Sequence, residues 1–318
     1  MTALTRGGLR AADVLSAIAV VAIWTYFLVF ARMGVKKVFT PWDMAFLRFA
    51  FAACAMLPVF LLRPAGQRLG ALSLRQATIL ACLAGIGFSC FAYLGFSYAP
   101  AAHGAVLMTG ALPFLTAIAA WIVLGEPIAG RKAWGLGLIL LGIGFIGWHS
   151  LSGAISGEEN STWRGDILFP CAASCWAIFA VLLRRWKVDP VDATIASALI
   201  GSVIYIPVYW LFLPKQILAA PLADILLQGM YQGVIALVVS MWLYTRVVQV
   251  FGATQTAMVT ALCPGLAALS GIFMLSEPLS MPVLLGLASV TIGMIVGVTG
   301  EIAANMTHLS ADPPTAVR

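Results

Sequence analysis

Charged residues are scarce in this chain. Asp, Glu, Lys and Arg make up 9% of its 318 residues, whereas a soluble domain carries about 25%. So few charges cannot cover a surface that faces water, and 62% of the residues are hydrophobic. The composition excludes an ordinary soluble protein and predicts a chain embedded in a lipid bilayer. The formal net charge of +6 predicts no nucleic-acid partner, because the basic residues lie in short loops rather than along one stripe.

The sequence also lacks the patterns of an enzyme. Its six cysteines have no C-x-x-C spacing, which argues against a metal or redox site. It contains no nucleotide-binding glycine loop, no H-E-x-x-H and no G-x-S-x-G. No Asp or Glu lies in the middle of an apolar segment, so a proton relay built on a central carboxylate is not supported. We therefore expect no catalytic residue, no metal and no cofactor.

What the sequence does contain is long apolar runs. A transmembrane helix needs about 20 mostly apolar residues, and ten runs of roughly this length are separated by proline and charged residues. They cover residues 14–33, 42–62, 76–98, 101–124, 129–149, 165–184, 191–213, 223–247, 252–275 and 280–300. The longest polar connection, about 150–164, divides the chain into two five-helix halves, at residues 1–152 and 153–318. We expect an all-α integral membrane protein with ten transmembrane helices.

The two halves repeat each other at a nearly constant offset of 151 residues, or 152 for one tryptophan pair. The matches are Trp24 with Trp176, Tyr93 with Tyr244, Thr109 with Thr260, Pro113 with Pro264, Glu126-Pro127 with Glu277-Pro278, Gly135 with Gly286 and Gly142 with Gly293. Because each half has an odd number of spans, the second half must enter the membrane from the opposite side. Inverted repeats are a transporter architecture, in which the substrate site lies between the repeats near the bilayer midplane.

Lys and Arg are unevenly distributed over the predicted loops. With the N-terminus in the cytoplasm, twelve basic residues fall on the cytoplasmic side and five on the external side, while Arg48 lies within a span. Cytoplasmic loops carry the excess of basic residues in membrane proteins. The count therefore predicts that both termini are cytoplasmic.

A Thr-x-x-x-Pro pattern occurs in the fourth span of each half, at Thr109 with Pro113 and at Thr260 with Pro264. Proline has no N–H, so the carbonyl four residues earlier loses its helical partner. In lipid such a group is tolerated only when it is buried in protein or lines a cavity. We interpret the two threonines as polar contacts of a central cavity. The alternative is that each hydroxyl bonds back to its own helix and repairs the kink.

Aromatic and polar side chains within the spans are further candidates for a solute pathway. The aromatic ones are Trp24, Tyr93, Trp176, Trp242 and Tyr244, which lie away from the interfacial belts where Trp and Tyr usually occur. They predict an aromatic pocket, with interhelical packing as the alternative. Arg48 is either a functional buried charge or a side chain that snorkels to the membrane surface. Gln232 is a weaker polar candidate, and His103 is expected at the interface.

The ends of several helices carry acidic residues. The same pattern begins the second span of each half: a residue with a capping oxygen, then Pro, then Asp two residues after the Pro. It occurs at residues 40–43 and 189–192 and indicates a capped helix start. Glu126 and Glu277 each follow a helix end, where the helix dipole disfavours an anion. Each begins a turn or makes a gating contact, and no basic residue lies near Glu277 in the sequence.

The last span of each half is rich in glycine. Gly135, Gly137, Gly142, Gly144 and Gly147 lie in one, and four glycines from Gly286 to Gly300 lie in the other. Small residues let helix backbones approach closely. These spans are predicted to form a scaffold or a homodimer interface rather than the pathway.

Together these features resemble the EamA-type family of the drug/metabolite transporter superfamily. They are the two five-helix halves, a Trp in the first helix of each, a Pro-kinked helix ending in Gly125-Glu126-Pro127 or Ser276-Glu277-Pro278, and the Gly-rich closing helices. Arg48 in Leu47-Arg48-Phe49 is similar to that family's first half. The resemblance covers about residues 14–300 and implies an inner-membrane carrier, often an exporter of amino acids or other small metabolites.

The chain departs from the family pattern at two places. Trp24 is followed by Thr25-Tyr26-Phe27 instead of the small and amide residues that are common there. The second-half position that corresponds to Arg48 is the uncharged Ser197. Both departures concern the identity of the substrate rather than the class of protein.

We predict an efflux carrier of small amphipathic solutes such as amino acids, working by alternating access at a cavity between the repeats. The cavity is expected to be lined by the first, third and fourth spans of each half. The alternative is a non-transporting membrane scaffold or assembly partner, in which the threonines and prolines would not affect flux. A lipid-modifying enzyme would need a polar catalytic cluster, and the sequence shows none.

Overall fold

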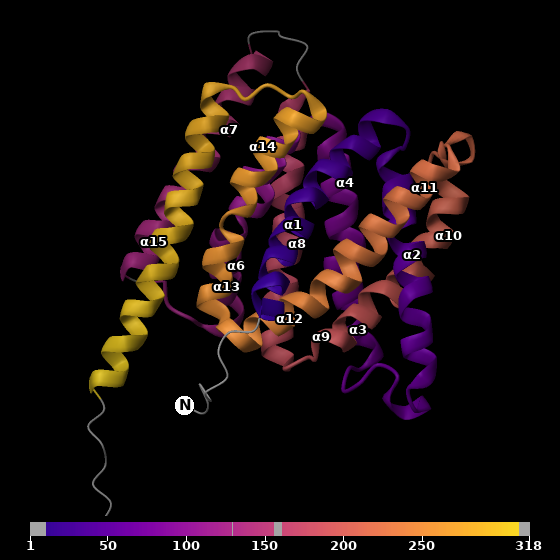
Figure 1. Cartoon of the computed structure of the whole chain (residues 1–318), viewed down its shortest axis with the longest axis horizontal. Coiled ribbons are helices and arrows are strands. Elements are labelled where there is room, and N and C mark those ends of the chain that lie inside the picture. Colours follow the sequence, from indigo (N-terminus) through magenta and orange to yellow (C-terminus); the bar gives the residue numbers. More distant parts are fainter. Residues whose placement is uncertain (1–10, 129, 156–160, 312–318) are drawn as a thin grey trace, which may run out of the picture.

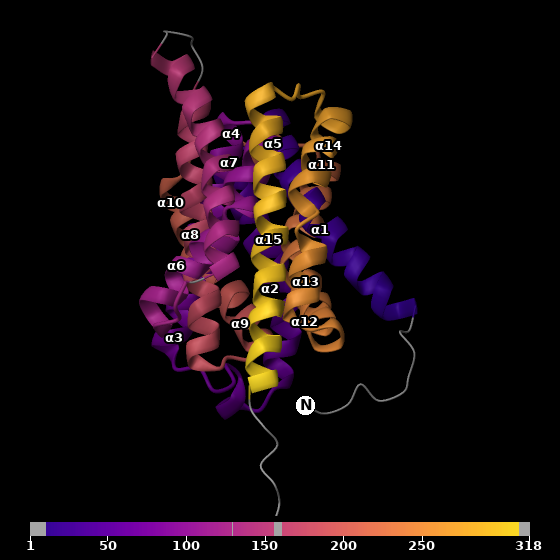
Figure 2. The same ribbon diagram turned by 90° about the vertical axis from the view of Figure 1, so that its left-hand side faces the viewer.

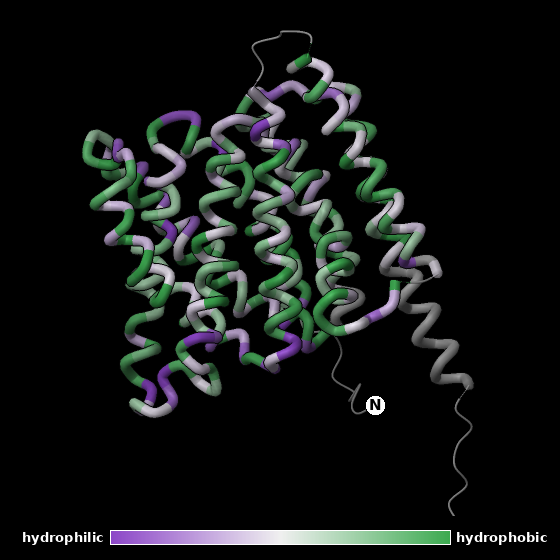
Figure 3. The backbone as a smooth tube through the Cα atoms, turned by 180° about the vertical axis from the view of Figure 1, so that it is seen from behind, coloured by the Kyte–Doolittle hydropathy of each residue, from purple (hydrophilic) through white to green (hydrophobic). Residues whose placement is uncertain are grey.

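The computed structural model of the chain describes residues 11–128, 130–155 and 161–311, and every regular element in these ranges is a helix (Figure 1). Nine helical segments in this part of the chain are long and apolar enough to cross a membrane, and Met281–Gly297 is a shorter apolar helix. Hydrophobic residues fill the middle of the bundle and hydrophilic ones gather towards its two ends (Figure 3). The fold is the all-α membrane architecture of ten spans that the sequence predicts.

The first five spans contain seven α-helices: α1 (Ala11–Lys37), α2 (Pro41–Leu62), α3 (Leu74–Leu80), α4 (Phe88–Tyr98), α5 (Ala101–Gly104), α6 (Leu112–Leu124) and α7 (Gly130–Ile155). The last five contain α8 (Thr162–Trp186), α9 (Pro190–Ile195), α10 (Gly201–Phe212), α11 (Leu222–Gln228), α12 (Ser240–Phe251), α13 (Ala253–Thr260), α14 (Cys263–Leu275) and α15 (Met281–Ala311). Wider π-helical turns interrupt four spans: η2 (Ala81–Gly87), η3 (Ala105–Gly110), η4 (Ala196–Ile200) and η6 (Gly229–Val239). Short 3₁₀ turns, η1 (Ala65–Gln67) and η5 (Ile217–Ala219), lie in two loops.

Ion pairs mark the two ends of the bundle. At the start of α1, Asp13 pairs with Arg246 of α12 at 2.8 Å. Near the end of α1, Arg32 pairs with Glu277, which follows α14, at 2.7 Å. We call the first end the N-terminal face and the second the opposite face; in Figure 1 they are the lower and upper ends.

The second half runs through the membrane in the reverse sense. Asp166 near the start of α8 contacts His103 of α5 at 2.7 Å, at the opposite face. Arg184 near the end of α8 pairs with Glu126, which follows α6, at the N-terminal face. So α8 runs from the opposite face to the N-terminal face, whereas α1 runs the other way (Figure 1). The two repeats are inverted, as an odd number of spans requires.

The halves interlock through their first helices. The α1 helix packs against α12 and α14 of the second half, and α8 packs against α4 and α6 of the first. In each case the first span of one half lies against the third and fourth spans of the other. This exchange makes a single core, in which Phe49, Tyr93, Phe96, Phe169 and Tyr209 are fully buried.

The glycine-rich helices α7 and α15 run side by side in the same chain (Figure 2). A Cβ added to Gly135 would lie 2.6 Å from the Gly293 carbonyl oxygen, and one added to Gly142 would lie 2.7 Å from that of Gly286. The repeated glycines Gly135, Gly142, Gly286 and Gly293 thus pack the two halves of one chain together. Their surfaces are covered within the chain and are not available to a homodimer. Gly137 and Gly144 have open space beside them, and a dimer through this outer face of α7 stays a prediction.

The last helix extends past its predicted end at about residue 300, because α15 continues to Ala311. The sequence from Glu301 to Ala311 contains no proline or glycine, and a helix already formed continues through such residues even where hydropathy falls. The first proline after it is Pro313, outside the described residues. Hydropathy locates the lipid-embedded part of a helix rather than its end.

Candidate functional site

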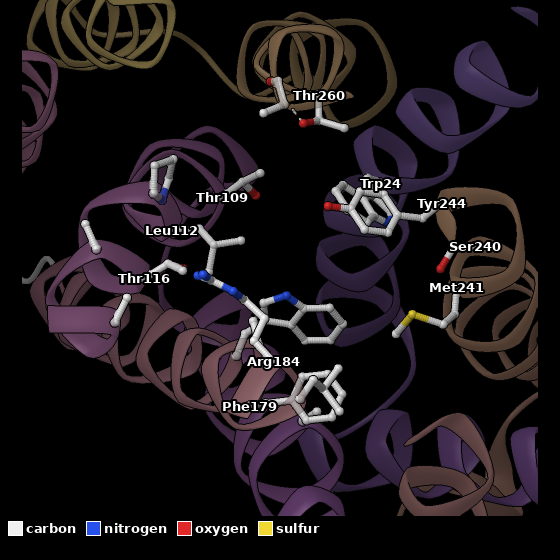
Figure 4. Close-up of a pocket in the computed structure, with 18 of the residues that line it drawn as sticks. Trp24, Thr109, Leu112, Thr116, Phe179, Arg184, Ser240, Met241, Tyr244 and Thr260 are labelled. Carbon is white, nitrogen blue, oxygen red and sulfur yellow. Dashed lines mark hydrogen bonds between the residues drawn. The ribbon is translucent and has the colours of Figure 1, made fainter. Parts of the chain in front are cut away.

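A cavity of about 440 Å³ lies between the two halves (Figure 4). It reaches the N-terminal face beside Glu126 and Arg184 and is lined by side chains from both repeats. The first half provides Trp24, Arg48, Thr109, Pro113, Thr116 and Glu126, and the second provides Trp176, Phe179, Arg184, Ser240, Tyr244 and Thr260, among others. Binding pockets for small molecules generally measure about 300–1,000 Å³, so the cavity is large enough for a small metabolite.

The π-helical turns are placed around this cavity. Each of the four contributes to its wall: Ala84 from η2, Thr109 from η3, Ser197 from η4 and Ala236 from η6. A π-helical turn widens a helix locally and often marks a functional site. Hydropathy does not detect such turns, so lining by the seventh span, through Ser197 of η4, was not predicted. The Gly-rich spans also contribute, through Leu136, Ile139 and Met294, which corrects their interpretation as scaffold alone.

Both Thr-x-x-x-Pro patterns break their helices and line the cavity, but their threonines differ. The Thr260 hydroxyl donates to the carbonyl oxygens of Thr256 and Ala257, at 3.0 and 3.1 Å, so it bonds back to its own helix. For Thr109 the structure shows no such bond within the described residues. Pro113 lines the cavity, whereas Pro264 is buried in α14. Thr109 is therefore the better placed of the two hydroxyls to contact a solute.

The predicted aromatic residues fall into three groups. Trp24 and Tyr244 line the cavity and stack on each other, with ring centroids 5.2 Å apart. Trp176 also lines it and packs against neighbouring phenylalanine rings. Tyr93 is fully buried behind the wall, and Trp242 is 61% exposed on the outer surface. The structure thus brings three of the five predicted aromatic residues to the cavity.

Arg48 lies at the closed end of the cavity. It is seven residues from the start of α2 at the opposite face, about 10 Å at roughly 1.5 Å per residue, and it is only 3% exposed. Its Nη1 donates to the backbone oxygen of Gln232 at 3.1 Å, and its guanidinium lies over the rings of Phe27 and Phe88. Arg48 therefore does not snorkel to the membrane surface. Gln232 itself is fully buried, and its side chain accepts a hydrogen bond from Tyr93 rather than lining the cavity.

Glu126 and Glu277, the repeated glutamates in the turn after the fourth span of each half, each pair with an arginine from the other half. Glu277 accepts from Arg32 at 2.7 Å and from the backbone N–H of Ala101 at 2.9 Å, and this pair is largely buried. Glu126 accepts from Arg184 at 2.5 Å at the mouth of the cavity, where both side chains are exposed. Neither arginine was predicted as a partner, although Arg32 and Arg184 are 152 residues apart, the same offset as the Trp pair.

The predicted helix caps are present at both second spans. Thr40 and Asp43 form a reciprocal capping box at the start of α2, and Asp189 accepts from the N–H of Val191 at the start of α9. Asp43 also accepts hydrogen bonds from Tyr209 and from the backbone N–H of Gln216. His103, which was expected at the interface, lies at the opposite face, where it is buried against Asp166. These acidic residues are structural partners of neighbouring helices rather than parts of the cavity wall.

Two inverted five-span repeats that enclose a cavity define a carrier-type membrane protein. The profile of the EamA-like transporter family matches residues 12–148 and 163–299, so the chain belongs to this family and is an EamA-family membrane transporter. It is 29% identical over 177 residues to "Uncharacterized transporter YyaM" of Bacillus subtilis (strain 168), a match that covers 54% of this chain and 56% of that relative. The chain also resembles a solved structure whose title is "Crystal structure of protein". The match covers 92% of this chain and 100% of the other, with a TM-score of 0.60 and 17% sequence identity, and it shows a shared fold.

Proposed function

We propose that this transporter exports amino acids or related amphipathic solutes across the inner membrane by alternating access, with both termini in the cytoplasm. In this proposal the N-terminal face is cytoplasmic and the cavity is open to the cytoplasm, while the opposite face is closed. The observation that carries the proposal is that one ion-pair arrangement occurs twice, once in each repeat, and is engaged differently at the two ends.

At the opposite face the ion pair closes the bundle. Arg32 of α1 and Glu277 after α14 belong to helices that pack on each other. Both residues also reach the next part of the first half: Arg32 donates to the Phe96 carbonyl of α4, and Glu277 accepts from the Ala101 N–H at the start of α5. These contacts tie α1 and α14 to the α4–α5 elbow, where the chain passes from α4 to α5.

At the N-terminal face, the equivalent ion pair makes no hydrogen bond to the equivalent α12–α13 elbow within the described residues. Arg184 of α8 and Glu126 after α6 bond to each other. The positions that correspond to Phe96 and Ala101, at the offset of 151, are Val247 and Gly252 on the α12–α13 elbow. The cavity lies between α8 and this elbow, as Arg184 and Tyr244 on its two sides show (Figure 4). Closing this face would let Arg184 donate to the Val247 carbonyl, and Glu126 would accept from the Gly252 N–H once that group leaves the Val248 carbonyl, to which it now donates at 2.9 Å.

The aromatic residues support the same interpretation. Tyr244 lines the cavity and stacks on Trp24, whereas its repeat partner Tyr93 is fully buried. Two equivalent tyrosines in unequal environments are expected when an inverted repeat is trapped in one of two related states. In the other state, Tyr93 would line a cavity open to the opposite face and Tyr244 would be buried.

Replacement of Trp24 tests the use of the cavity. We expect Trp24→Ala to reduce solute exchange in proteoliposomes by at least tenfold, because it removes the larger ring of the stacked pair in the cavity wall. Amino acids, aromatic acids and amphipathic amines are suitable solutes for the screen. Trp242→Ala is the matched control, since Trp242 lies in the same membrane region but faces outward, and it should leave exchange within about twofold.

Two outcomes would count against the proposal. If Trp24→Ala and Trp242→Ala were equally active, the cavity would not be the solute route. If the unaltered protein exchanged no solute of any of these classes, the scaffold alternative would gain support.

A further inference from the structure

The charge at the closed end of the cavity has no counter-charge among the residues that the structure describes. The Arg48 guanidinium donates to the neutral Gln232 carbonyl and lies beside the neutral Tyr93 hydroxyl, and its Nε has no partner among the described residues. No carboxylate lies within 4.0 Å of its guanidinium in this part of the chain. The acid nearest in sequence, Asp43, is held by the capping box, Tyr209 and the Gln216 N–H. A buried cation is costly unless an anion pairs with it.

The rest of the binding site does not supply that anion. Glu126 is the one acidic residue among the described residues that line the cavity, and it lies at the mouth in its pair with Arg184. Close to Arg48, the rings of Phe27 and Phe88 lie 5.5 and 5.8 Å from its guanidinium carbon. The closed end therefore offers hydrogen-bond donors and positive charge, and no acid to receive a cation.

We infer that Arg48 binds the negatively charged group of the substrate, so that this carrier selects organic anions with an apolar body, such as monocarboxylates, over zwitterions and cations of the same size. The inference rests on the proposed function and narrows its solutes to the related amphipathic anions, so that zwitterionic amino acids become poor substrates. A guanidinium binds a carboxylate through two parallel hydrogen bonds, and the unpartnered Nε is available for one of them. The Trp24–Tyr244 stack then provides an apolar wall for the body of the substrate.

An ammonium group would be poorly accommodated at this end of the cavity. It would lose its water without gaining a carboxylate, and it would lie close to the Arg48 charge. Ser197 occupies the position of Arg48 in the second half, so at the closed end the positive charge lies on one side of the pseudo-two-fold axis, while the other basic side chains of the wall, Lys132 and Arg184, accompany Glu126. The Arg48 guanidinium can therefore pair with one anionic group of each substrate molecule.

Three probes of one carbon skeleton test the inference: 3-phenylpropionate, L-phenylalanine and phenethylamine. Their affinities for the full-length protein in nanodiscs can be measured by calorimetry at pH 7.5, with protein-free nanodiscs as the control for lipid partition. We expect 3-phenylpropionate to bind at least tenfold more tightly than the other two. Because this comparison uses the unaltered protein, its result does not depend on whether a variant folds.

Substitutions then assign the preference to one side chain. Arg48→Gln should weaken binding of 3-phenylpropionate by at least tenfold and bring the three affinities together, while Arg48→Lys should keep part of the preference. Arg164→Gln, at an exposed arginine outside the cavity, is the control and should change nothing. A purely structural role for Arg48 would lower stability without altering the ratio of the three affinities.

The outcomes separate this inference from the proposed function. Equal affinities for the three probes, or an anion preference that survives Arg48→Gln, would overturn the anion site while leaving a carrier that uses the cavity. Failure of every probe to bind would overturn the inference as well. The proposed function fails only if solute exchange is absent or is insensitive to Trp24→Ala.

Discussion

Glu277→Gln is expected to open the opposite face of the transporter. The substitution keeps the shape of the side chain but leaves the largely buried Arg32 without its counter-charge. Removing one partner of a buried ion pair costs about 3–5 kcal/mol, and about 3 kcal/mol corresponds to roughly 100-fold in an equilibrium constant. The cost falls on the closed arrangement, because Arg32 can reach water when that face opens.

Cys90 is a native reporter for this opening. It corresponds, at the offset of 151, to Met241, which lines the cavity that is open to the N-terminal face. With the other five cysteines replaced by alanine, we expect Glu277→Gln to raise the alkylation rate of Cys90 by a water-soluble maleimide by up to 100-fold. Glu126→Gln is the matched control: its pair is exposed and worth about 0–1 kcal/mol, so the rate should change less than about fivefold. Equal rates in the two variants would contradict the assignment of Arg32–Glu277 as the closed lock.

Gly142→Val is expected to prevent stable folding. Its Cβ would lie 2.7 Å from the Gly286 carbonyl oxygen, and backbone on α15 cannot move aside as a flexible side chain can. Inserting methyl groups into a packed interface typically costs about 1–3 kcal/mol and more when the backbone must shift. We expect loss of about 3 kcal/mol or more of stability, measured as the thermal unfolding of the protein in detergent and as the yield of monodisperse protein.

Gly144→Val provides the control on the same helix. No atom lies within 4 Å of the position where its Cβ would be, so the change in stability should stay within about 0.5 kcal/mol. The same variant examines the predicted dimer, because a change of oligomeric mass on Gly144→Val would show that the outer face of α7 is an interface. Equal destabilisation by the two valines would contradict the close packing of α7 on α15.

Patterns local in sequence predicted most of the fold. Apolar runs located the spans, the constant offset predicted the inverted repeat, and the capped starts at Thr40 and Asp189 followed from their residue types. The helix breaks between Thr109 and Pro113 and between Thr260 and Pro264 also followed from neighbouring residues. Each of these features depends on a few neighbouring residues and on the preference of an apolar segment for lipid.

The direction in which a side chain faces was harder to predict. Trp24 and Trp242 both lie within apolar spans, yet one lines the cavity and the other is 61% exposed. A helix that is hydrophobic all round has no polar face to set its rotation, so hydropathy cannot assign one side to lipid and the other to a cavity.

Differences between equivalent residues could not be predicted either. The sequence treats Tyr93 and Tyr244, or Glu126 and Glu277, as copies. A single conformation makes one member of each pair buried and the other accessible. The ion-pair partners Arg32 and Glu277 are 245 residues apart in the chain. The one sequence signal for this pair is that Arg32 and Arg184 are separated by nearly the same offset as Glu126 and Glu277.

The central claim is that the two inverted halves open one cavity to each face in turn. The distance between spin labels at Arg185 and Gln249 reports whether the N-terminal face is open. The distance between labels at Lys36 and Ser97 reports the same for the opposite face, and all four residues are exposed. In nanodiscs with a transported solute, pulsed electron paramagnetic resonance should show a population in which the first distance shortens while the second lengthens. Distances that stay fixed, or that change in the same direction at both faces, would contradict the account.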